Sequence, residues 1–214
     1  MDTERTDEEL LAAFQQGDAG AFELLLRRHR APLFTFLLRM LGDRERAEDL
    51  AQETFLRIVK GAQAWEQRAR FQTWLYTIAR NLCVDQSRRD RFRRADSLDQ
   101  TDGPEGDERT VGEGIAGSAI SPERGAESAR LRPLLQRALL GLPVEQREVF
   151  ILREQAGLAF REIAGLVGTN ENTVKSRMRY ALEGMRKSLA RDGIDATQAQ
   201  EPGPETPGVR LGRA

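Results

Sequence analysis

Hydrophobic positions recur at spacings of three and four residues through most of residues 7–92, a pattern that predicts helices. Three amphipathic stretches cover about residues 19–41, 44–62 and 71–90. Asp18 and Asp43 precede the first two stretches and can cap the helices. Pro32 lies inside the first stretch and predicts a kink or a break. No segment alternates with the period of two expected of a strand. We therefore expect residues 1–94 to form an all-helical domain.

The pattern is lost at residue 95 and returns at residue 128. Residues 95–127 are rich in Gly, Asp, Glu, Ser and Thr and bury too little apolar surface to fold, so we predict a flexible acidic linker. Residues 128–191 again carry helical periodicity and predict a second small helical domain. Residues 192–214 are rich in Pro and Gly and predict a disordered tail. The expected fold class is all-α, with two domains on one linker.

Composition narrows the class of protein. The 214 residues are 39% hydrophobic and 31% charged, without an apolar run of the length that spans a membrane, so we expect a cytoplasmic protein with no membrane insertion. His29 and Cys83 are the single histidine and the single cysteine. They cannot make a disulfide or a zinc ligand set, and we expect no metal and no cofactor. Nor do paired carboxylates suggest a catalytic residue, so a helical enzyme is the least favoured class.

The formal net charge of −1 conceals a strong segregation of charge along the chain. Residues 68–94 carry eight Arg against two Asp, residues 95–123 carry one Arg against eight acidic side chains, and residues 161–191 carry seven basic side chains against three Glu. Two basic segments thus flank an acidic one. Because local patches decide whether a polyanion binds, both basic segments are candidates for nucleic-acid contact.

Residues 160–191 have the pattern of a helix-turn-helix. Gly168 falls at the turn between the two helices, and Thr169 is placed to cap the second one. The expected core positions are Ile163, Ala164, Val167, Val174, Met178, Ala181, Leu182, Met185 and Leu189. The opposite face of the second helix carries the candidate DNA contacts, Thr173, Lys175, Ser176, Arg177 and Arg179. A solvated basic surface is the alternative for this face, but the filled cap, turn and core positions favour DNA binding.

The first basic segment, "FQTWLYTIARNLCVDQSRR", is also two-faced. Its apolar side comprises Phe71, Trp74, Leu75, Ile78 and Leu82, and we expect Phe71 and Trp74 to pack in the core. Its polar side carries Gln72, Thr73, Thr77, Arg80, Asn81, Asp85, Arg88 and Arg89. Asn can read a base edge and Arg can hold phosphate or guanine, so this side suits nucleic acid. For Tyr76 two alternatives remain: it lies at the rim of the core, or it stacks on an exposed base.

At these residues the sequence resembles the extracytoplasmic-function (ECF) sigma factors of the sigma-seventy family. Four stretches carry the resemblance in the family's order: "AEDLAQETFLRI", "FQTWLYTIARNLCVDQSRR", "LGLPVEQREVFILRE" and "FREIAGLVGTNENTVKSRM". The resemblance covers about residues 7–92 and 128–190. It implies a protein that is not an enzyme but lends promoter specificity to core RNA polymerase.

The resemblance also implies partners and contacts. The segment "AEDLAQETF" is expected to dock on the clamp helices of the largest polymerase subunit, through Glu48, Asp49, Gln52, Glu53 and Phe55. The second domain is expected to meet the flap of the second-largest subunit. An anti-sigma factor is expected as a further partner. The acidic linker matches the family's connector. Its negative charge could take the place of RNA phosphates, or the linker could be a plain solvated spacer, and the two alternatives are equal.

Two promoter elements are implied in the same way. The helix after "KGAQAWEQRAR" is expected to engage the minus-ten element through Arg80, Asn81, Asp85, Arg88 and Arg89, and that loop resembles one that holds a base flipped out of the duplex. The helix after Thr169 is expected to enter the major groove of the minus-thirty-five element. Tyr180 stands where several relatives have Arg and Asn172 where relatives often have Gly, so the contacts there are expected to differ in detail.

Two other classes of protein compete with this interpretation. A dimeric helix-turn-helix regulator would use the first domain to sense a ligand or to dimerise, but such a domain has no need of the basic segment at residues 68–94. A purely protein-binding helical module would show no salt-sensitive binding to nucleic acid even with polymerase present.

Overall fold

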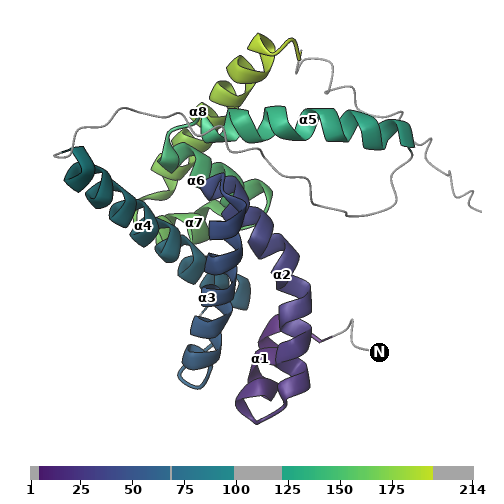
Figure 1. Ribbon diagram of the computed structural model, residues 1–214. Coiled ribbons are helices and arrows are strands. Elements are labelled where there is room, and N and C mark those ends of the chain that lie inside the picture. The colour runs from purple at the N-terminus through teal and green to yellow at the C-terminus, as the bar shows by residue number, and fades with distance from the viewer. Residues whose placement is uncertain (1–4, 68, 99–121, 195–214) are drawn as a thin grey trace, which may run out of the picture.

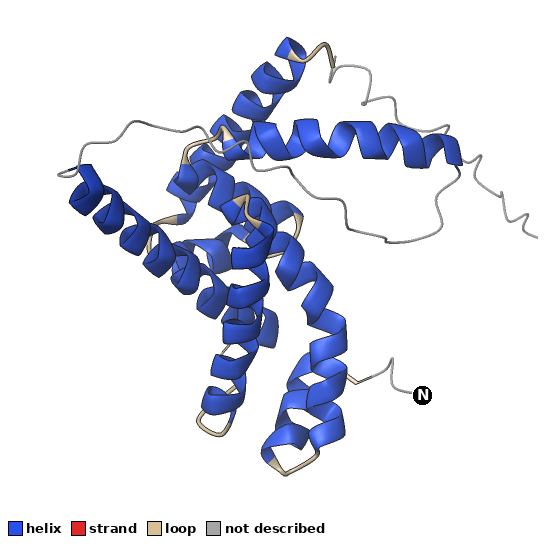
Figure 2. Cartoon of the chain, viewed as in Figure 1, coloured by secondary structure: helices blue, strands red, loops and turns tan. Residues whose placement is uncertain are grey.

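A computed structural model describes residues 5–67, 69–98 and 122–194 of the chain. Every regular element in these ranges is an α-helix, which confirms the predicted all-helical fold (Figures 1 and 2). The helices are α1 (Asp7–Gln15), α2 (Ala19–Leu41), α3 (Arg44–Ala62), α4 (Phe71–Leu98), α5 (Pro122–Leu140), α6 (Val144–Glu154), α7 (Phe160–Val167) and α8 (Glu171–Arg191).

Local caps set the starts of α2 and α3. Asp18 accepts from the backbone N–H of Ala21 at 3.1 Å, and Asp43 accepts from that of Arg46 at 3.1 Å, as the sequence predicted. Helix α2 ends at Gly42, whose φ of 72° is the left-handed conformation that suits glycine. Pro32 lies inside α2, and the helix continues through it, so of the predicted kink or break the break does not occur.

The helix-turn-helix occupies the predicted residues, with two local differences. Gly168 ends α7 in the left-handed conformation at φ 72°, as expected. The cap of α8 is Asn170, whose side chain accepts from Thr173 N–H at 2.8 Å, so the predicted cap at Thr169 was wrong by one residue. Leu182 was expected in the core but is 39% exposed, because the buried face of α8 runs through Val174, Met178, Ala181 and Met185.

The helices before and after the acidic segment pack against each other. Helix α6 packs against α2, α7 packs against α4, and α5 crosses beside α8 (Figure 1). One continuous set of buried side chains includes Leu37 of α2, Leu139 of α5 and Leu152 of α6. Gln155 donates to the Pro32 carbonyl at 3.0 Å and ties the end of α6 to the middle of α2.

The described helices also extend into the predicted linker from both sides. Helix α4 continues to residue 98 and α5 begins at residue 122, so the ends of the 95–127 segment are helical. Residues 99–121 of that segment, and residues 195–214 of the predicted tail, lie outside the described residues.

Candidate nucleic-acid and polymerase interfaces

Helix α8 presents the predicted recognition face to solvent. Lys175, Ser176 and Arg179 are exposed, and Thr173 and Arg177 are half-buried. The opposite side of the helix is buried against α6 and α7, so the amphipathic pattern fixes which side chains are free to reach a groove. All five predicted residues therefore lie in the N-terminal half of one anchored helix.

Two contacts organise the basic side chains of α8. Lys175 forms an ion pair with Glu171 one turn earlier, at 2.7 Å. The guanidinium of Arg179 stacks on the ring of Tyr180 at 4.9 Å from its centroid and donates to the Tyr180 hydroxyl at 3.2 Å. Tyr180, noted in the sequence as a departure from relatives, is 48% exposed and supports the arginine beside it.

Helix α4 carries the predicted minus-ten residues on two different sides. Asn81, Asp85, Arg88 and Arg89 are exposed. Three of them, at positions 81, 85 and 88, are spaced to share one face of the helix. This stripe is the part of the predicted site that is free to meet a nucleic acid.

Arg80 lies apart from that stripe and contacts the second half of the chain. Its Nε donates to Glu148 Oε1 of α6 at 2.5 Å, and the Glu148 side chain is only 5% exposed. Nearby, the Thr73 hydroxyl donates to Glu162 Oε1 of α7 at 3.1 Å. Two carboxylates thus occupy donors on α4 that were expected to face DNA. Neither glutamate was a candidate from the sequence, because a lone Glu in a helix is typical of a solvated face.

Two aromatic side chains of α4 lie in the core, and a third packs against it. Phe71 is fully buried, as predicted, and Trp74 packs at the edge of the core. Tyr76, left open between a rim and a stacking position, is also fully buried, with its ring edge-on to Phe36 at 5.0 Å. Burial raises the pKa of the Tyr76 phenol to about 12. Stacking of Tyr76 on a base is therefore excluded in this arrangement.

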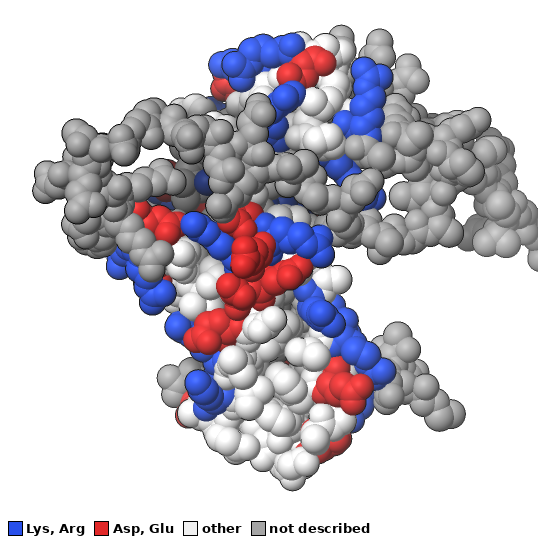
Figure 3. All heavy atoms as spheres, viewed as in Figure 1, with Lys and Arg blue, Asp and Glu red and all other residues white. Residues whose placement is uncertain are grey.

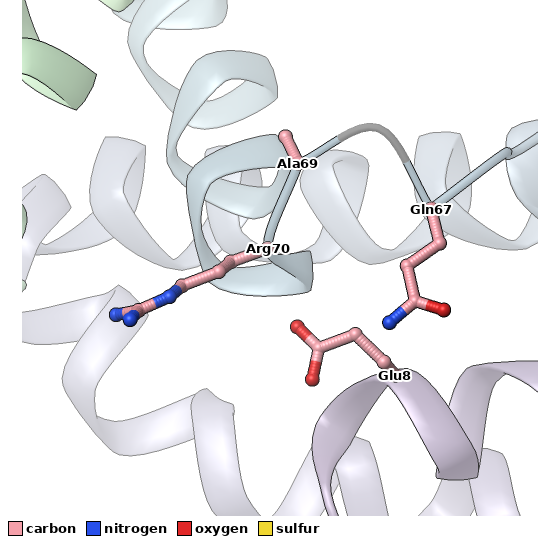
Figure 4. Close-up of a pocket in the computed structure, with 4 residues that line it drawn as sticks. All are labelled: Glu8, Gln67, Ala69 and Arg70. Carbon is pink, nitrogen blue, oxygen red and sulfur yellow. The ribbon is translucent and has the colours of Figure 1, made fainter.

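The loop between α3 and α4 borders a shallow cavity of about 390 Å³. Gln67, Ala69 and Arg70 line it from the loop, and Glu8 lines it from α1 (Figure 4). The Glu8 carboxylate lies between the Gln67 and Arg70 side chains in that view. Hydrogen-bond donors and acceptors therefore both line this opening beside the start of α4.

Helix α3 presents most of the predicted polymerase-docking face. Glu48, Asp49 and Gln52 are exposed, Glu53 is half-buried, and acidic side chains gather over α3 in the middle of the face seen in Figure 3. Arg57 donates to Glu53 at 2.8 Å, and this hydrogen bond lowers the pKa of the Glu53 carboxyl.

Phe55, the predicted apolar anchor of that face, is 8% exposed and packs in the core. It follows Ala47 and Ala51 along the buried side of α3 and is not accessible in this arrangement, and its role in polymerase docking stays a prediction. The apolar side chains exposed on α3 are Leu56, at 53%, and Val59, at 40%. Neither residue was among the docking contacts that the family resemblance implied. Both follow Gln52 at helical spacing, four and seven residues later, and so lie on the same side of α3.

The described residues also lack two other classes of site. Within those ranges, no three His, Cys, Asp or Glu side chains are grouped so that they could hold a metal ion. In the same part of the chain, no helix is long and apolar enough to cross a membrane.

Comparison with known proteins matches both halves of the chain. Residues 25–93 match the model for sigma-70 region 2, and residues 132–183 match the model for sigma-70 region 4. The chain is 32% identical over 177 residues to the ECF RNA polymerase sigma factor SigW of Bacillus subtilis, covering 82% of this chain and 92% of that protein. It is 34% identical over 179 residues to SigL of Mycobacterium tuberculosis, covering 83% and 93%.

Solved structures show a similar fold. CnrH in complex with the cytosolic domain of CnrY matches with a TM-score of 0.62 and 21% identity, covering 88% of this chain and 99% of that chain. RpoE of Bartonella quintana, in complex with the anti-sigma factor NepR, matches with a TM-score of 0.62 and 24% identity, covering 80% and 98%.

An all-helical chain with a helix-turn-helix is typical of a DNA-binding transcription factor. This chain belongs to the ECF sigma factors of the sigma-70 family, with regions 2 and 4 both present. It directs RNA polymerase to promoters and is an initiation factor rather than an enzyme, since the polymerase performs the chemistry.

Proposed function

We propose that two exposed helix faces divide the promoter between them. Helix α8 enters the major groove of the minus-thirty-five element through Thr173, Lys175, Ser176, Arg177 and Arg179. Helix α4 engages the minus-ten element through Asn81, Asp85, Arg88 and Arg89. The observation that carries the proposal is that each face is anchored by a buried apolar side and exposes long donors.

Arg80 joins the minus-ten face only when the two halves of the chain separate. In the packed arrangement its guanidinium is occupied by Glu148, and Thr73 by Glu162. Helices α6 and α7 therefore cover one side of α4 in the free chain. Binding to core polymerase supplies the free energy that separates them, and the polymerase then fixes the spacing at which both helices meet DNA.

Polymerase docking uses the exposed side of α3. Glu48, Asp49, Gln52 and Glu53 provide polar contacts to the clamp helices of the largest subunit, and the second domain meets the flap of the second-largest. Leu56 replaces Phe55 as the apolar anchor, because an anchor must be accessible before the partner binds. Val59 extends the same apolar surface.

An anti-sigma factor is the proposed negative regulator. Two structural relatives were solved as complexes, one with an anti-sigma factor and one with the cytosolic domain of CnrY. A protein that stabilises the packed arrangement of this chain would keep it from promoters without blocking every DNA-binding side chain.

Run-off transcription with core RNA polymerase on genomic fragments tests the proposal. Wild-type protein should initiate at discrete sites that share two spaced sequence elements, and substitutions in α8 and α4 should each weaken one element. Transcripts that start at the same sites without the protein would contradict it. Binding as a dimer to a palindromic duplex, without polymerase, would favour a helix-turn-helix regulator instead.

A further inference from the structure

Helix α1 is joined to the loop that precedes α4 at both ends of that loop. At the start of the loop, Gln15 Nε2 donates to the carbonyls of Ala62, at 2.7 Å, and Trp65, at 3.0 Å. In return, Gln63 Nε2 donates to the Gln15 carbonyl at 3.3 Å. One side chain of α1 thus bonds the carbonyl of the last residue of α3, which also accepts from the Trp65 N–H at 3.1 Å, and a carbonyl of the loop that follows.

At the far end of the loop, Glu8 caps α4. Its Oε1 accepts from the backbone N–H of Phe71, the first residue of the helix, at 2.8 Å. The preceding residue, Arg70, has no side-chain acceptor and cannot serve as a local cap. The cap therefore comes from 63 residues away, and the carboxylate is also favourably placed at the positive end of the helix dipole.

Other contacts, outside this loop, hold α1 in place. Thr6 and Glu9 form a capping box at its start, with hydrogen bonds of 2.8 and 3.2 Å. Asp7 accepts from Arg28 at 3.0 Å and hydrogen bonds to His29 at 2.7 Å. Its apolar side buries Leu10 and Leu11 completely. Removing Glu8 or Gln15 should therefore release the loop without detaching α1.

The cavity beside the loop is formed by α1 and the loop together. Its wall is formed by Glu8 on one side and by Gln67, Ala69 and Arg70 on the other (Figure 4). The indole of Trp65 packs near that of Trp74, with ring centroids 6.1 Å apart, so the first half of the loop also rests on α4. A shift of α1 or of the α4 cap would therefore change the shape of this opening.

We infer that Glu8 and Gln15 are positioning residues that hold the loop between α3 and α4 in the shape that captures the minus-ten strand. This inference rests on the proposed function, in which α4 meets the minus-ten element, and on the loop's expected part in holding a base flipped out of the duplex. Both residues precede residues 25–93, which match sigma-70 region 2. They act on DNA through the loop and the start of α4 rather than by touching it.

The test uses full-length protein bound to core RNA polymerase, on a duplex promoter found by run-off transcription and carrying 2-aminopurine in its minus-ten element. Fluorescence rises when the duplex opens. Loss of a helix cap corresponds to about fivefold in an equilibrium constant. Glu8→Ala and Gln15→Ala should therefore each lower the opening equilibrium by about fivefold. Glu8→Gln keeps an acceptor for the Phe71 N–H and should restore most of the opening.

Gln16→Ala is the matched control, because Gln16 is the exposed neighbour of Gln15, and it should open the promoter normally. Polymerase affinity, measured by fluorescence anisotropy, should be unchanged in all variants. Normal opening by Glu8→Ala and Gln15→Ala would overturn the inference while leaving the proposed function intact. If the variants lost polymerase binding together with promoter opening, and Glu8→Gln did not restore either, the effect would be a general structural one and the inference would also be overturned. No fluorescence rise with wild-type holoenzyme would overturn the proposed function as well.

Discussion

Arg80 of α4 and Glu148 of α6 form an ion pair across the contact between the two halves of the chain, with Nε 2.5 Å from Oε1. The Glu148 side chain is 5% exposed and that of Arg80 is 23% exposed. Such a pair is costly to break from one side, because the remaining charge is left without a partner. The pair therefore favours the arrangement in which α6 and α7 cover one side of α4.

Glu148→Ala should shift the free protein toward separated domains. Loss of one partner of a buried pair destabilises the packed arrangement by about 2–4 kcal/mol, and Arg80 becomes available to a minus-ten oligonucleotide. Free Glu148→Ala protein should therefore bind that single strand more tightly than wild type. Glu145→Ala, at an exposed position of the same helix, is the control and should behave as wild type. Weaker or equal binding by Glu148→Ala would contradict the prediction.

Cys83 provides a native reporter of the same separation. The thiol is 3% exposed, and burial, with a contribution from the Glu148 charge, raises its pKa to about 12. Alkylation of the free wild-type protein at pH 8 should be slow, because the thiolate is the reactive form. Glu148→Ala should accelerate it by about 30-fold or more, the factor that corresponds to about 2 kcal/mol of easier opening. Equal rates in the two proteins would show that this pair does not control access to Cys83.

The two neighbouring apolar residues of α3 should respond oppositely to truncation. Phe55→Ala leaves a cavity in the core and should lower the free energy of unfolding by about 3 kcal/mol in a denaturant titration. Leu56→Ala should change stability by less than about 0.5 kcal/mol but weaken binding to core polymerase by about tenfold. A Leu56→Ala protein that assembles normally with polymerase would remove Leu56 from the docking surface.

Arg179 should contribute to recognition of the minus-thirty-five element. Arg179→Ala should weaken promoter binding by holoenzyme by about 1–3 kcal/mol and relax sequence preference at one position of that element. Lys175→Ala should have an effect of the same size if it touches a base, and a sequence-independent effect if it touches phosphate. Arg186→Ala, exposed on the later part of α8, is the control. An unchanged promoter profile for Arg179→Ala would assign its guanidinium to the stack on Tyr180 alone.

Asp7 should make the stability of the protein depend on pH in the acid range. Its hydrogen bond to His29, assisted by Arg28, lowers the pKa of the Asp7 carboxyl. A lowered pKa in the folded state contributes stability above the unfolded pKa of about 4, and that contribution is lost as pH falls through the folded pKa. Asp7→Asn should therefore cost about 1–2 kcal/mol at pH 7 and progressively less as pH falls below about 4. Parallel stability curves for the two proteins between pH 7 and pH 2 would contradict the assignment.

Local patterns predicted the helices well because caps and periodicity are properties of neighbouring residues. Asp18, Asp43 and Gly168 are at helix ends as expected. The spacing of Phe55 with Ala47 and Ala51 also indicated a buried position, and the structure places it there. Periodicity could predict this burial because it depends on this chain's own residues.

Long-range contacts were not predictable from the sequence. Glu8 and Phe71, or Arg80 and Glu148, are separated by more than 60 residues, and their partners are set by how the helices pack. The sequence pattern predicts a solvated position for a glutamate in a helix, whether that side chain faces water, caps another helix or pairs with a buried arginine. Those three roles differ only in the tertiary structure.

The distance between the two domains, measured with and without core polymerase, shows whether the halves of the chain separate when the holoenzyme forms. Glu23→Cys in α2 and Ala190→Cys in α8, both at exposed positions, would carry a dye pair on a Cys83→Ser background. We predict high transfer efficiency with a narrow distribution in the free protein, and a distinct low-efficiency state in the holoenzyme. The same efficiency in both states, or a broad low-efficiency distribution in the free protein, would show that the minus-ten face of α4 is not covered in the free chain and uncovered on binding to polymerase.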